Sequence, residues 1–264
     1  KVTVMTCHHT QRHCQPQPTG PLGSRLLAGL RELLLPTRCL LCGALPPRDT
    51  SAGARQGSPV CPGCDGDLPW VQGAATGTPV VDLDGAFAAL VYRYPVDRLI
   101  QAVKFQRRLA LARSLGRLLA WHGLPPGLGS GAGPIVLVPV PLSGDRHGER
   151  GFNQAEELAR GAAGVLGLRV ASRACRRLRP TPPQSGLGAS ARIRNVAGAF
   201  GPGRDLARLP DLAATRFVVV DDVFTTGATA AAVARALREG GARTVMLWTL
   251  ARALRRRGTS GRRN

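Results

Sequence analysis

The sequence predicts an α/β fold in which a parallel sheet is flanked by helices. Short, almost wholly apolar segments alternate with longer segments whose leucines and alanines recur at helical spacing. Apolar strands of this kind are buried on both faces, which is typical of parallel sheets. A third observation predicts a small appendage, because residues 37–80 are rich in Gly and Pro and carry two pairs of cysteines. A chain of 264 residues is long enough for both.

We divide the chain into four parts. Residues 1–24 read as a disordered lead-in without the apolar region of a signal peptide. Residues 25–80 hold a short amphipathic helix over 25–36 and the paired cysteines, residues 81–252 form the α/β domain, and residues 253–264 form a basic tail. No stretch of 18 apolar residues is free of charge, so neither a transmembrane segment nor a membrane partner is expected.

The elements of the α/β domain follow from the periodicity of its apolar residues. Residues 176–200 show no such periodicity and are rich in Arg, Pro and Gly, so we expect a long loop. A long loop inside a compact domain is usually a functional lid or disorder, and we favour the lid. Strands are expected at 87–92, 135–140, within 168–175, at 217–220 and at 244–250, and helices at 96–105, 109–121, 155–166 and 228–238.

The net charge and the number of cysteines limit which classes of protein this chain can belong to. The net charge is +20, and every basic residue except Lys1 and Lys104 is arginine. This balance favours anionic partners, whether phosphate ligands or polynucleotides. A disulfide scaffold is not expected in a chain of this length without a secretory signal, so a reducing cytoplasm fits the seven cysteines better.

The segment from Phe217 to Arg238 predicts an anion-binding turn. We expect Asp221 and Asp222 to mark the carboxyl end of a buried strand, because a charged continuation should not be buried. The following turn, Thr225 to Thr229, leads into an Ala-rich helix, and Gly227 lets the backbone approach a ligand. Consecutive N–H groups and the helix N-terminus bind a phosphate, and the two carboxylates suit cis-diol hydroxyls or Mg²⁺. A ribose with a 5-phosphate carries all of these groups.

Two other interpretations of this turn are open. A Walker A loop needs Gly-Lys-Ser/Thr, and the only internal lysine, Lys104, follows Val103. The turn could also be an acidic connection before a Thr-capped helix, although capping a helix does not need two aspartates. We therefore keep the phosphate site as the working hypothesis.

The paired cysteines predict a structural zinc site. Cys39 and Cys42 form one C-x-x-C pair, and Cys61 and Cys64 form a second one after 18 intervening residues, which is the spacing of a four-cysteine zinc ribbon. The stretch between the pairs is poor in apolar residues, so the metal would supply the folding energy. A redox motif would instead place a single C-x-x-C at the start of a helix within a βαβ unit.

These motifs together resemble the ComF family of competence-associated proteins, which carry a type I phosphoribosyltransferase-like domain behind an N-terminal zinc ribbon. The segment from Asp221 to Thr229 resembles the motif that binds 5-phosphoribosyl-1-pyrophosphate (PRPP) in that fold. The likeness covers about residues 25–252, including Val138 to Leu142 and Arg150 to Gln154. It implies that PRPP is held by Val220, Asp221, Asp222, Thr225, Thr226, Gly227, Ala228 and Thr229.

The resemblance also implies roles for residues outside this motif. The loop after strand 135–140 would hold pyrophosphate, with Arg146 and Arg150 as phosphate contacts, although each could be an ordinary surface arginine. Lys104 is either a phosphate contact or a surface lysine at a helix end. A lid closing over the sugar would carry Arg177, Thr181, Gln184, Arg192 and Asn195.

Two functions remain open from the sequence. In the first, the protein is a phosphoribosyltransferase that binds PRPP with Mg²⁺ and transfers the phosphoribosyl group to an unknown base, amine or ammonia. In the second, it is a non-catalytic PRPP- or nucleotide-binding module in DNA uptake or processing, which contacts single-stranded DNA or competence and helicase proteins. Aromatic residues make up only 4% of the chain, which offers few platforms for stacking bases.

Overall fold

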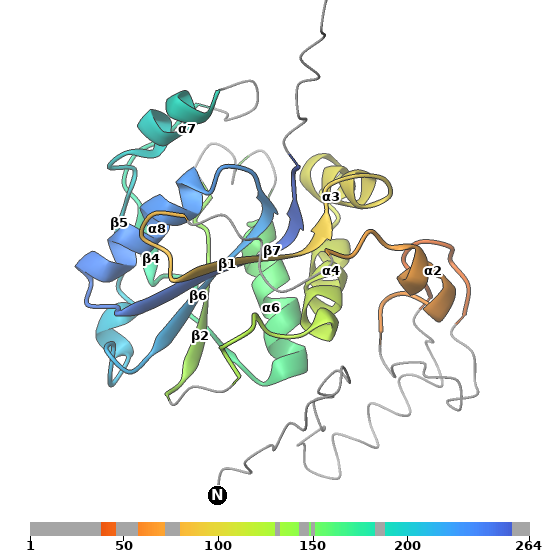
Figure 1. The fold of residues 1–264 in the computed structure, drawn as a ribbon, viewed down its shortest axis with the longest axis horizontal. Coiled ribbons are helices and arrows are strands. Elements are labelled where there is room, and N and C mark those ends of the chain that lie inside the picture. The colour runs from red at the N-terminus through yellow and green to blue at the C-terminus, as the bar shows by residue number, and fades with distance from the viewer. Residues whose placement is uncertain are drawn as a thin grey trace, which may run out of the picture.

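A five-stranded parallel sheet forms the centre of the molecule (Figure 1). The computed structural model describes residues 38–45, 58–71, 80–129, 133–142, 148, 151–182 and 188–254. The strand order is β1-β7-β6-β2-β3, with bounds β1 Gly85–Val91, β2 Ile135–Pro139, β3 Arg169–Val170, β6 Arg216–Phe224 and β7 Thr244–Arg252.

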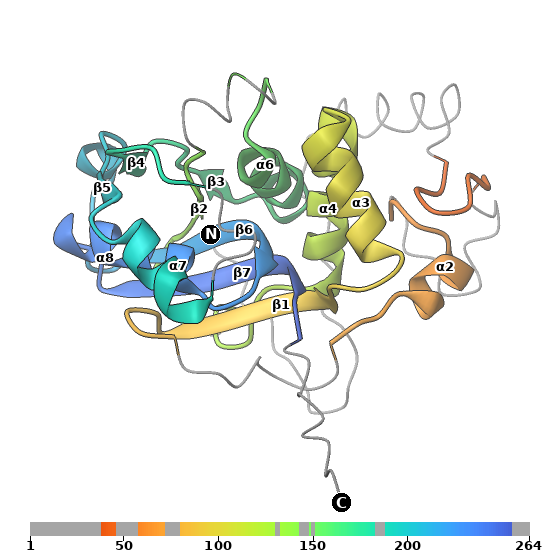
Figure 2. The ribbon, with the colours of Figure 1, turned by 90° about the horizontal axis from the view of Figure 1, so that it is seen from above.

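Helices cover both faces of this sheet, which confirms the predicted fold class. Helices α3 (Val96–Phe105), α4 (Leu109–His122) and α6 (Gln154–Leu166) pack on one face, and α8 (Ala228–Glu239) packs on the other (Figure 2). The smaller elements are α2 (Pro62–Asp67), α7 (Ala189–Val196), the 3₁₀ turn η1 (Leu206–Arg208) and the antiparallel pair β4 (Cys175–Arg177) and β5 (Phe200–Pro202).

Strand β6 is central because each of its faces belongs to a different hydrophobic core. Val218 and Val220 join the core under α3, α4 and α6, whereas Phe217 and Val219 join the core under α8. All four side chains are fully buried. This double burial explains why the sequence shows an unbroken apolar run at this strand.

The structure corrects three expectations about secondary structure. First, β6 does not end at Val220 but continues to Phe224, because it stays paired with β7 as far as Arg252. Second, the strand expected within 168–175 is two short strands, β3 and β4, that belong to different sheets. Third, 176–200 is not structureless, because β4 ends in it, α7 lies within it and β5 begins at Phe200.

Some expectations fall outside the part of the chain that the structure describes. They include the lead-in 1–24, the helix over 25–36 and most of the basic tail, residues 255–264. Among the described helices, none combines the length and the apolar character needed to cross a bilayer.

Helices α4 and α6 lie against each other with almost no space between their backbones. A Cβ atom on Gly161 would lie 2.1 Å from the carbonyl oxygen of Arg113, and one on Gly116 would lie 2.1 Å from that of Leu158. Two glycines, one on each helix, therefore allow this approach. The contact fixes α6, whose first residues follow the loop after β2.

We expect Gly161→Ala to destabilise the fold by about 1–3 kcal/mol, because the added methyl group must push the two helices apart. Gly164→Ala on the same helix is the matched control, since a Cβ there meets nothing within 4 Å. That change should stabilise α6 by about 0.5–1 kcal/mol. Urea unfolding of both variants measures the difference, and equal stabilities would contradict the packing argument.

Candidate functional site

The turn between β6 and α8 has a backbone that only glycine fits. Gly227 precedes the first helical residue with a φ of +78°, in the left-handed region. A Cβ on Gly227 would lie 2.7 Å from the Cγ1 atom of Val80 and 3.0 Å from the Phe224 ring. Substitution would therefore strain the backbone and displace Val80, which packs beneath the turn.

A pocket opens at this turn, at the carboxyl ends of β6 and β7. Six of the predicted PRPP residues line it: Asp221, Thr225, Thr226, Gly227, Ala228 and Thr229. The first N–H groups of a helix have no partner within the helix and attract anions; in α8 the Ala228 N–H donates to the Thr226 hydroxyl over 3.4 Å. The predicted residues Val220 and Asp222 do not line the pocket. Val220 is fully buried, and its carbonyl accepts a hydrogen bond from the Val140 N–H over 3.0 Å.

Five lining residues were not among those predicted from the sequence: Val223, Phe224 and Ala230 beside the turn, and Leu247 and Thr249 on the neighbouring strand. Leu247 and Thr249 reach the pocket from β7. Thr249 is 1% exposed, and its hydroxyl donates to the carbonyl of Phe87 on β1 over 3.2 Å. In the sequence, Thr249 stands out only as a polar residue inside an apolar strand. The pairing of β6 with β7 is what brings it to the pocket.

The two aspartates face opposite sides of the sheet, as successive residues of a strand do. Asp221 lines the pocket on the α8 side, whereas Asp222 borders a small cavity among α3, α4, α6 and β7. Asp222 is 7% exposed, and its Oδ2 atom lies 2.8 Å from the Nζ atom of Lys104. The expectation that a charged continuation of the strand would not be buried is therefore wrong, because Lys104 neutralises the buried carboxylate.

Asp221 has the most perturbed carboxyl group at this edge of the described sheet. Burial raises its pKa to about 7, and the neighbouring Asp222 carboxylate contributes to the rise. The Asp222 N–H, which donates to the Asp221 carboxylate over 2.8 Å, and the Lys104 ammonium lower this pKa but are outweighed. A half-buried acid with such a pKa is a common feature of ligand sites, where a bound group restores the lost interactions.

The loop after β2 is fastened at its ends. Arg146 and Arg150 lie outside the described residues, so their predicted role stays a prediction. Asn153 caps α6 by accepting from the Ala155 N–H over 3.0 Å, and its amide donates to the carbonyl of Val140 over 3.0 Å. One side chain thus joins the start of α6 to the end of β2.

Of the predicted lid residues, Arg177 is held by the protein itself. Its guanidinium donates to the carbonyl of Pro141 over 3.2 Å, also donates to the Thr181 hydroxyl, and lies 5.0 Å from the centre of the Phe200 ring. Arg177 therefore links β4 to the start of the loop after β2.

Two other predicted lid residues, Arg192 and Asn195, lie on α7. Asn195 donates to the carbonyl of Pro182 over 3.0 Å, which joins α7 to the segment before it. Arg192 lies on the same helix and is half-buried. Gln184 lies outside the described residues. The lid function of these residues stays a prediction.

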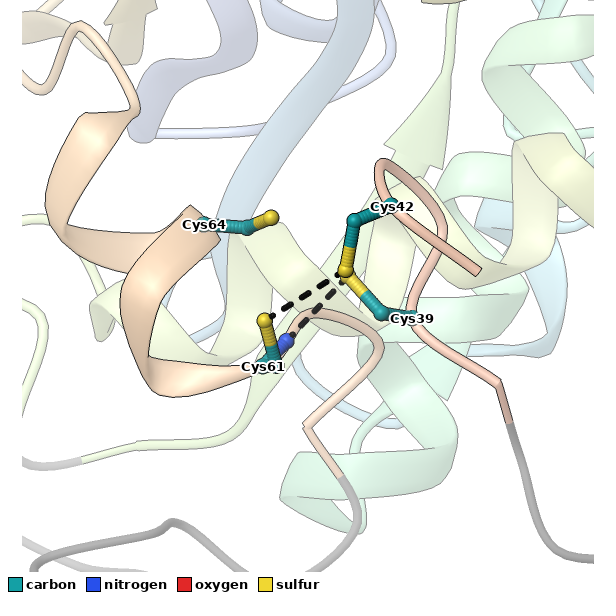
Figure 3. Close-up of side chains that lie close together, drawn as sticks. All are labelled: Cys39, Cys42, Cys61 and Cys64. Carbon is teal, nitrogen blue, oxygen red and sulfur yellow. Dashed lines mark hydrogen bonds between the residues drawn. The ribbon is translucent and has the colours of Figure 1, made fainter. Parts of the chain in front are cut away.

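The four paired cysteines converge on one point (Figure 3). Cys39 and Cys42 come from a turn, and Cys61 and Cys64 come from the start of α2. All four sulfur atoms lie within 4.8 Å of one another, and those of Cys42 and Cys61 are 3.7 Å apart. Tetrahedral zinc with Zn–S bonds of about 2.3 Å requires sulfur separations of about 3.8 Å. The four cysteines therefore fit a closed, structural zinc site.

The pKa values of these cysteine thiols are shifted in different directions. Burial alone would raise the pKa of Cys39, but hydrogen bonds from the backbone around Cys42, Cys61 and Leu41 lower it to about 6. Burial and the neighbouring thiols raise the pKa of Cys64 instead. A bound cation would favour the thiolate form at all four positions.

The cysteine ribbon is joined to the main sheet by Trp70. This residue forms an antiparallel bridge with Leu90 of β1, and its ring stacks on His122 at the end of α4 with centroids 4.6 Å apart. Its indole N–H donates to the carbonyl of Asp65 in α2 over 2.8 Å. Cys39 and Leu68 join the core under α3 and α4, so the ribbon and the sheet share one hydrophobic cluster.

Comparison with known proteins gives relatives for most of the chain. No protein-family model matches it. The chain is 39% identical over 164 residues to the DNA utilization protein YhgH of Salmonella typhi, which covers 62% of this chain and 70% of that protein. The protein of the same name in Escherichia coli K12 is 38% identical over 164 residues, with the same coverage. Competence protein F of Haemophilus influenzae is 33% identical over 170 residues, 61% of this chain and 70% of the relative.

We expect purified protein to hold about one zinc ion per chain and Cys61→Ser to lose it, because three thiolates no longer close a tetrahedral site. Loss of the metal should also lower the thermal stability, since the ribbon shares its core with the sheet. Elemental analysis and calorimetry measure both effects. Cys175→Ala is the control, because Cys175 lies on β4 outside the cluster. A variant of Cys61 that retains its zinc would exclude this site.

We expect Asp221→Asn to stabilise the free protein, and to do so more at high pH. Because the pKa of Asp221 is raised to about 7, the folded protein keeps this carboxyl protonated where the unfolded chain, with a pKa near 4, is ionised. Stability is therefore lost as pH rises from about 4 through about 7. Urea unfolding at about pH 5 and about pH 8 tests this, and the gain of D221N over the wild type should be larger at the higher pH.

Asp222→Asn provides the contrast to this prediction. It leaves the Lys104 ammonium without its carboxylate, and it should cost about 1–2 kcal/mol at both pH values. A gain for D221N that does not change with pH would contradict the raised pKa of Asp221.

Proposed function

We propose, from the premise that the chain belongs to the ComF family, that it binds PRPP together with Mg²⁺ and transfers the phosphoribosyl group to an acceptor with release of pyrophosphate. The observation that carries this proposal is the pocket at the turn between β6 and α8. There a raised-pKa carboxyl group, four threonines and the start of a helix meet. A phosphate and a hydroxyl-bearing sugar on one small molecule match these groups.

In this proposal the turn from Thr225 to Thr229 binds the 5-phosphate. Hydroxyls of the threonines and N–H groups at the start of α8 donate to its oxygens. Asp221, which lines the pocket, accepts hydrogen bonds from the ribose hydroxyls. On the other side of the sheet, the Lys104 ammonium pairs with the Asp222 carboxylate and holds this end of β6. Mg²⁺ arrives with the diphosphate of the ligand, since it prefers oxygen ligands and retains several of them from phosphates and water.

The loop after β2 would receive the leaving group. Arg177 holds Pro141 at the start of this loop, and Asn153 holds its other end, so that the loop is anchored on both sides. Arg146 and Arg150 would supply charge for the pyrophosphate. Such a site needs no covalent intermediate, because positioning and charge stabilisation supply the rate enhancement.

The chemical step is a substitution at C1 of the ribose. The bond between C1 and the pyrophosphate oxygen breaks, and its electron pair leaves with pyrophosphate. A lone pair on a base, an amine or ammonia forms the new bond to C1, and the acceptor releases a proton. Closure of the segment around α7 would exclude water, which would otherwise take the place of the acceptor.

We expect replacement of both Asp221 and Asp222 by Asn to weaken PRPP binding on the order of a hundredfold or more, because the Asp221 hydrogen bonds to the ribose and the ion pair that holds Asp222 on Lys104 are both lost. Calorimetry with PRPP and Mg²⁺ measures it, with Asp97→Asn on α3 as the control. Unchanged binding in the double variant would exclude this assignment. Pyrophosphate release by the wild type, screened over bases, amines and ammonia, then identifies the acceptor.

A second candidate function, binding of single-stranded DNA, is favoured by a groove beside the cysteine ribbon. The groove has a volume of about 540 Å³ and lies between α3 and the turn that carries Cys39 and Cys42. Tyr94 and Phe105 line it and are 76% and 77% exposed, although the chain has few aromatic residues. We call this surface the α3 groove; its lining is Leu40, Leu41, Tyr94, Pro95, Arg98, Leu99, Gln101, Ala102, Phe105, Gln106 and Arg108.

The chemistry of the α3 groove suits nucleic acid. Exposed aromatic rings stack on bases, and the guanidinium groups of Arg98 and Arg108 suit phosphates. No acidic residue lines the groove. The names of the relatives point the same way, since they concern DNA utilization and competence. In this function PRPP or a nucleotide would be a bound ligand and not a substrate.

We expect the double variant Tyr94→Ala with Phe105→Ala to weaken binding of single-stranded DNA about tenfold or more, because each stacked base contributes about 1–3 kcal/mol. Gel-shift titrations of an oligonucleotide across salt concentrations measure it. Ile193→Ala, which removes an exposed apolar side chain from α7, is the control. Wild-type binding that is absent near physiological salt, or that the double variant retains in full, would rule out this function for the α3 groove.

A further inference from the structure

The turn from Thr225 to Thr229 rests on a side chain from a segment that lies far away in the sequence. A Cβ atom on Gly227 would lie 2.7 Å from the Cγ1 atom and 3.0 Å from the Cγ2 atom of Val80. Both methyl groups of Val80 therefore fill the space in which any other residue at position 227 would carry its side chain. Val80 packs on the same hydrophobic core as Phe224 and Ala228, but it does not line the pocket. Its contact supports the turn and leaves the place of a ligand free.

The start of α8 needs such support because Gly227 cannot cap it. Gly227 occupies the N-cap position with a φ of +78°, and it has no side chain that could accept a hydrogen bond from the first N–H groups. A serine or aspartate in this position would fix the start of the helix, but it would also occupy N–H groups that an anion needs. A glycine leaves those groups available but populates many backbone conformations. Packing against Val80 supplies the rigidity that a capping side chain would otherwise provide.

Residues 80–84, which carry Val80, are fastened to the last turns of α8. Arg235 donates to the Asp82 carboxylate over 2.9 Å. Arg238 donates to the Asp82 carbonyl over 3.2 Å and to the Asp84 carboxylate over 2.9 Å. Exposed ion pairs of this kind add little to stability, but together these contacts fix where the segment runs. The segment cannot slide along the helix, so its first residue stays against the turn.

We infer that Val80 is a positioning residue that sets the direction of the N–H groups at the start of α8 toward a phosphate. With the two methyl groups of Val80 in place, Gly227 keeps one left-handed conformation, and the donors are arranged before any ligand arrives. Such donors bind more tightly because the ligand does not have to order them. The inference rests on the proposed function, in which this turn binds the 5-phosphate of PRPP.

The test compares Val80→Ala with Val81→Ala in the full chain, by calorimetric titration with ribose 5-phosphate. The first variant removes the two methyl groups that contact the turn, whereas the second removes the same atoms from a side chain that is 75% exposed. Val80→Ala should bind ribose 5-phosphate about three- to tenfold more weakly, because the turn must then be ordered on binding. Val81→Ala should bind like the wild type. Val80→Ile, which keeps a branched side chain at the contact, should retain most of the affinity.

Each outcome of this titration decides a definite point. A loss of affinity that is confined to Val80→Ala and that Val80→Ile reverses supports the inference. Wild-type affinity in Val80→Ala overturns it. An equal loss in both alanine variants, or a loss that Val80→Ile does not reverse, also overturns it. A wild type that does not bind ribose 5-phosphate refutes the proposed function instead, and the role of Val80 is then decided without any ligand.

That second measurement is hydrogen exchange in the free protein. The Ala231 N–H donates to the carbonyl of Gly227 over 2.8 Å, so its exchange reports opening of the first turn of α8. This amide should exchange about three- to tenfold faster in Val80→Ala than in Val81→Ala, with a smaller change at Leu247 in the centre of the sheet. Unchanged exchange at Ala231, or the same acceleration at both amides, overturns the inference. Because no ligand is used, the measurement separates failure of the contact from failure of the proposed function.

Discussion

The ammonium group of Lys104 lies 2.8 Å from the carboxylate of Asp222, and this contact allows β6 to carry an acid into the interior at its carboxyl end. Without it, a charge that is 7% exposed would have to be neutralised or turned into solvent. With it, β6 stays paired to β7 as far as Phe224, and the following turn is held at the edge of the sheet. The position of the pocket depends on that extension.

The same extension places the two acids of the motif in different surroundings. Asp222 has a cation beside it, whereas Asp221 faces the pocket with its pKa raised by burial and by its neighbour. The free protein therefore keeps an acid whose ionisation is unfavourable at the place where a ligand is expected. Such conflict between stability and function is common at binding sites, where the ligand restores the missing interactions. Gly227 holds the turn at this edge of the sheet. Its left-handed backbone conformation favours glycine, and a Cβ atom at this position would collide with Val80.

The cysteine ribbon extends the molecule without forming a separate core. Trp70 ties it to β1 and α4, and its apolar residues join those of α3 and α4. This attachment creates the α3 groove, because one wall comes from the ribbon and the other from α3. A metal that folds the ribbon would thus also shape a surface of the main domain. The proposed PRPP site and the α3 groove lie on different elements, so the two candidate functions can be tested independently.

The sequence by itself determined what depends on local pattern: the α/β class, the order of the main elements, the turn from Thr225 to Thr229 and the convergence of four cysteines. Periodicity, turn chemistry and ligand spacing are read within a few residues, so these features needed no fold. The tertiary structure alone decided which side of the sheet each aspartate faces and that Lys104 meets Asp222. It also placed Thr249 at the pocket and gathered Tyr94 and Phe105 at one groove. These facts depend on strand pairing and helix packing between segments far apart in the chain, and no local pattern encodes them.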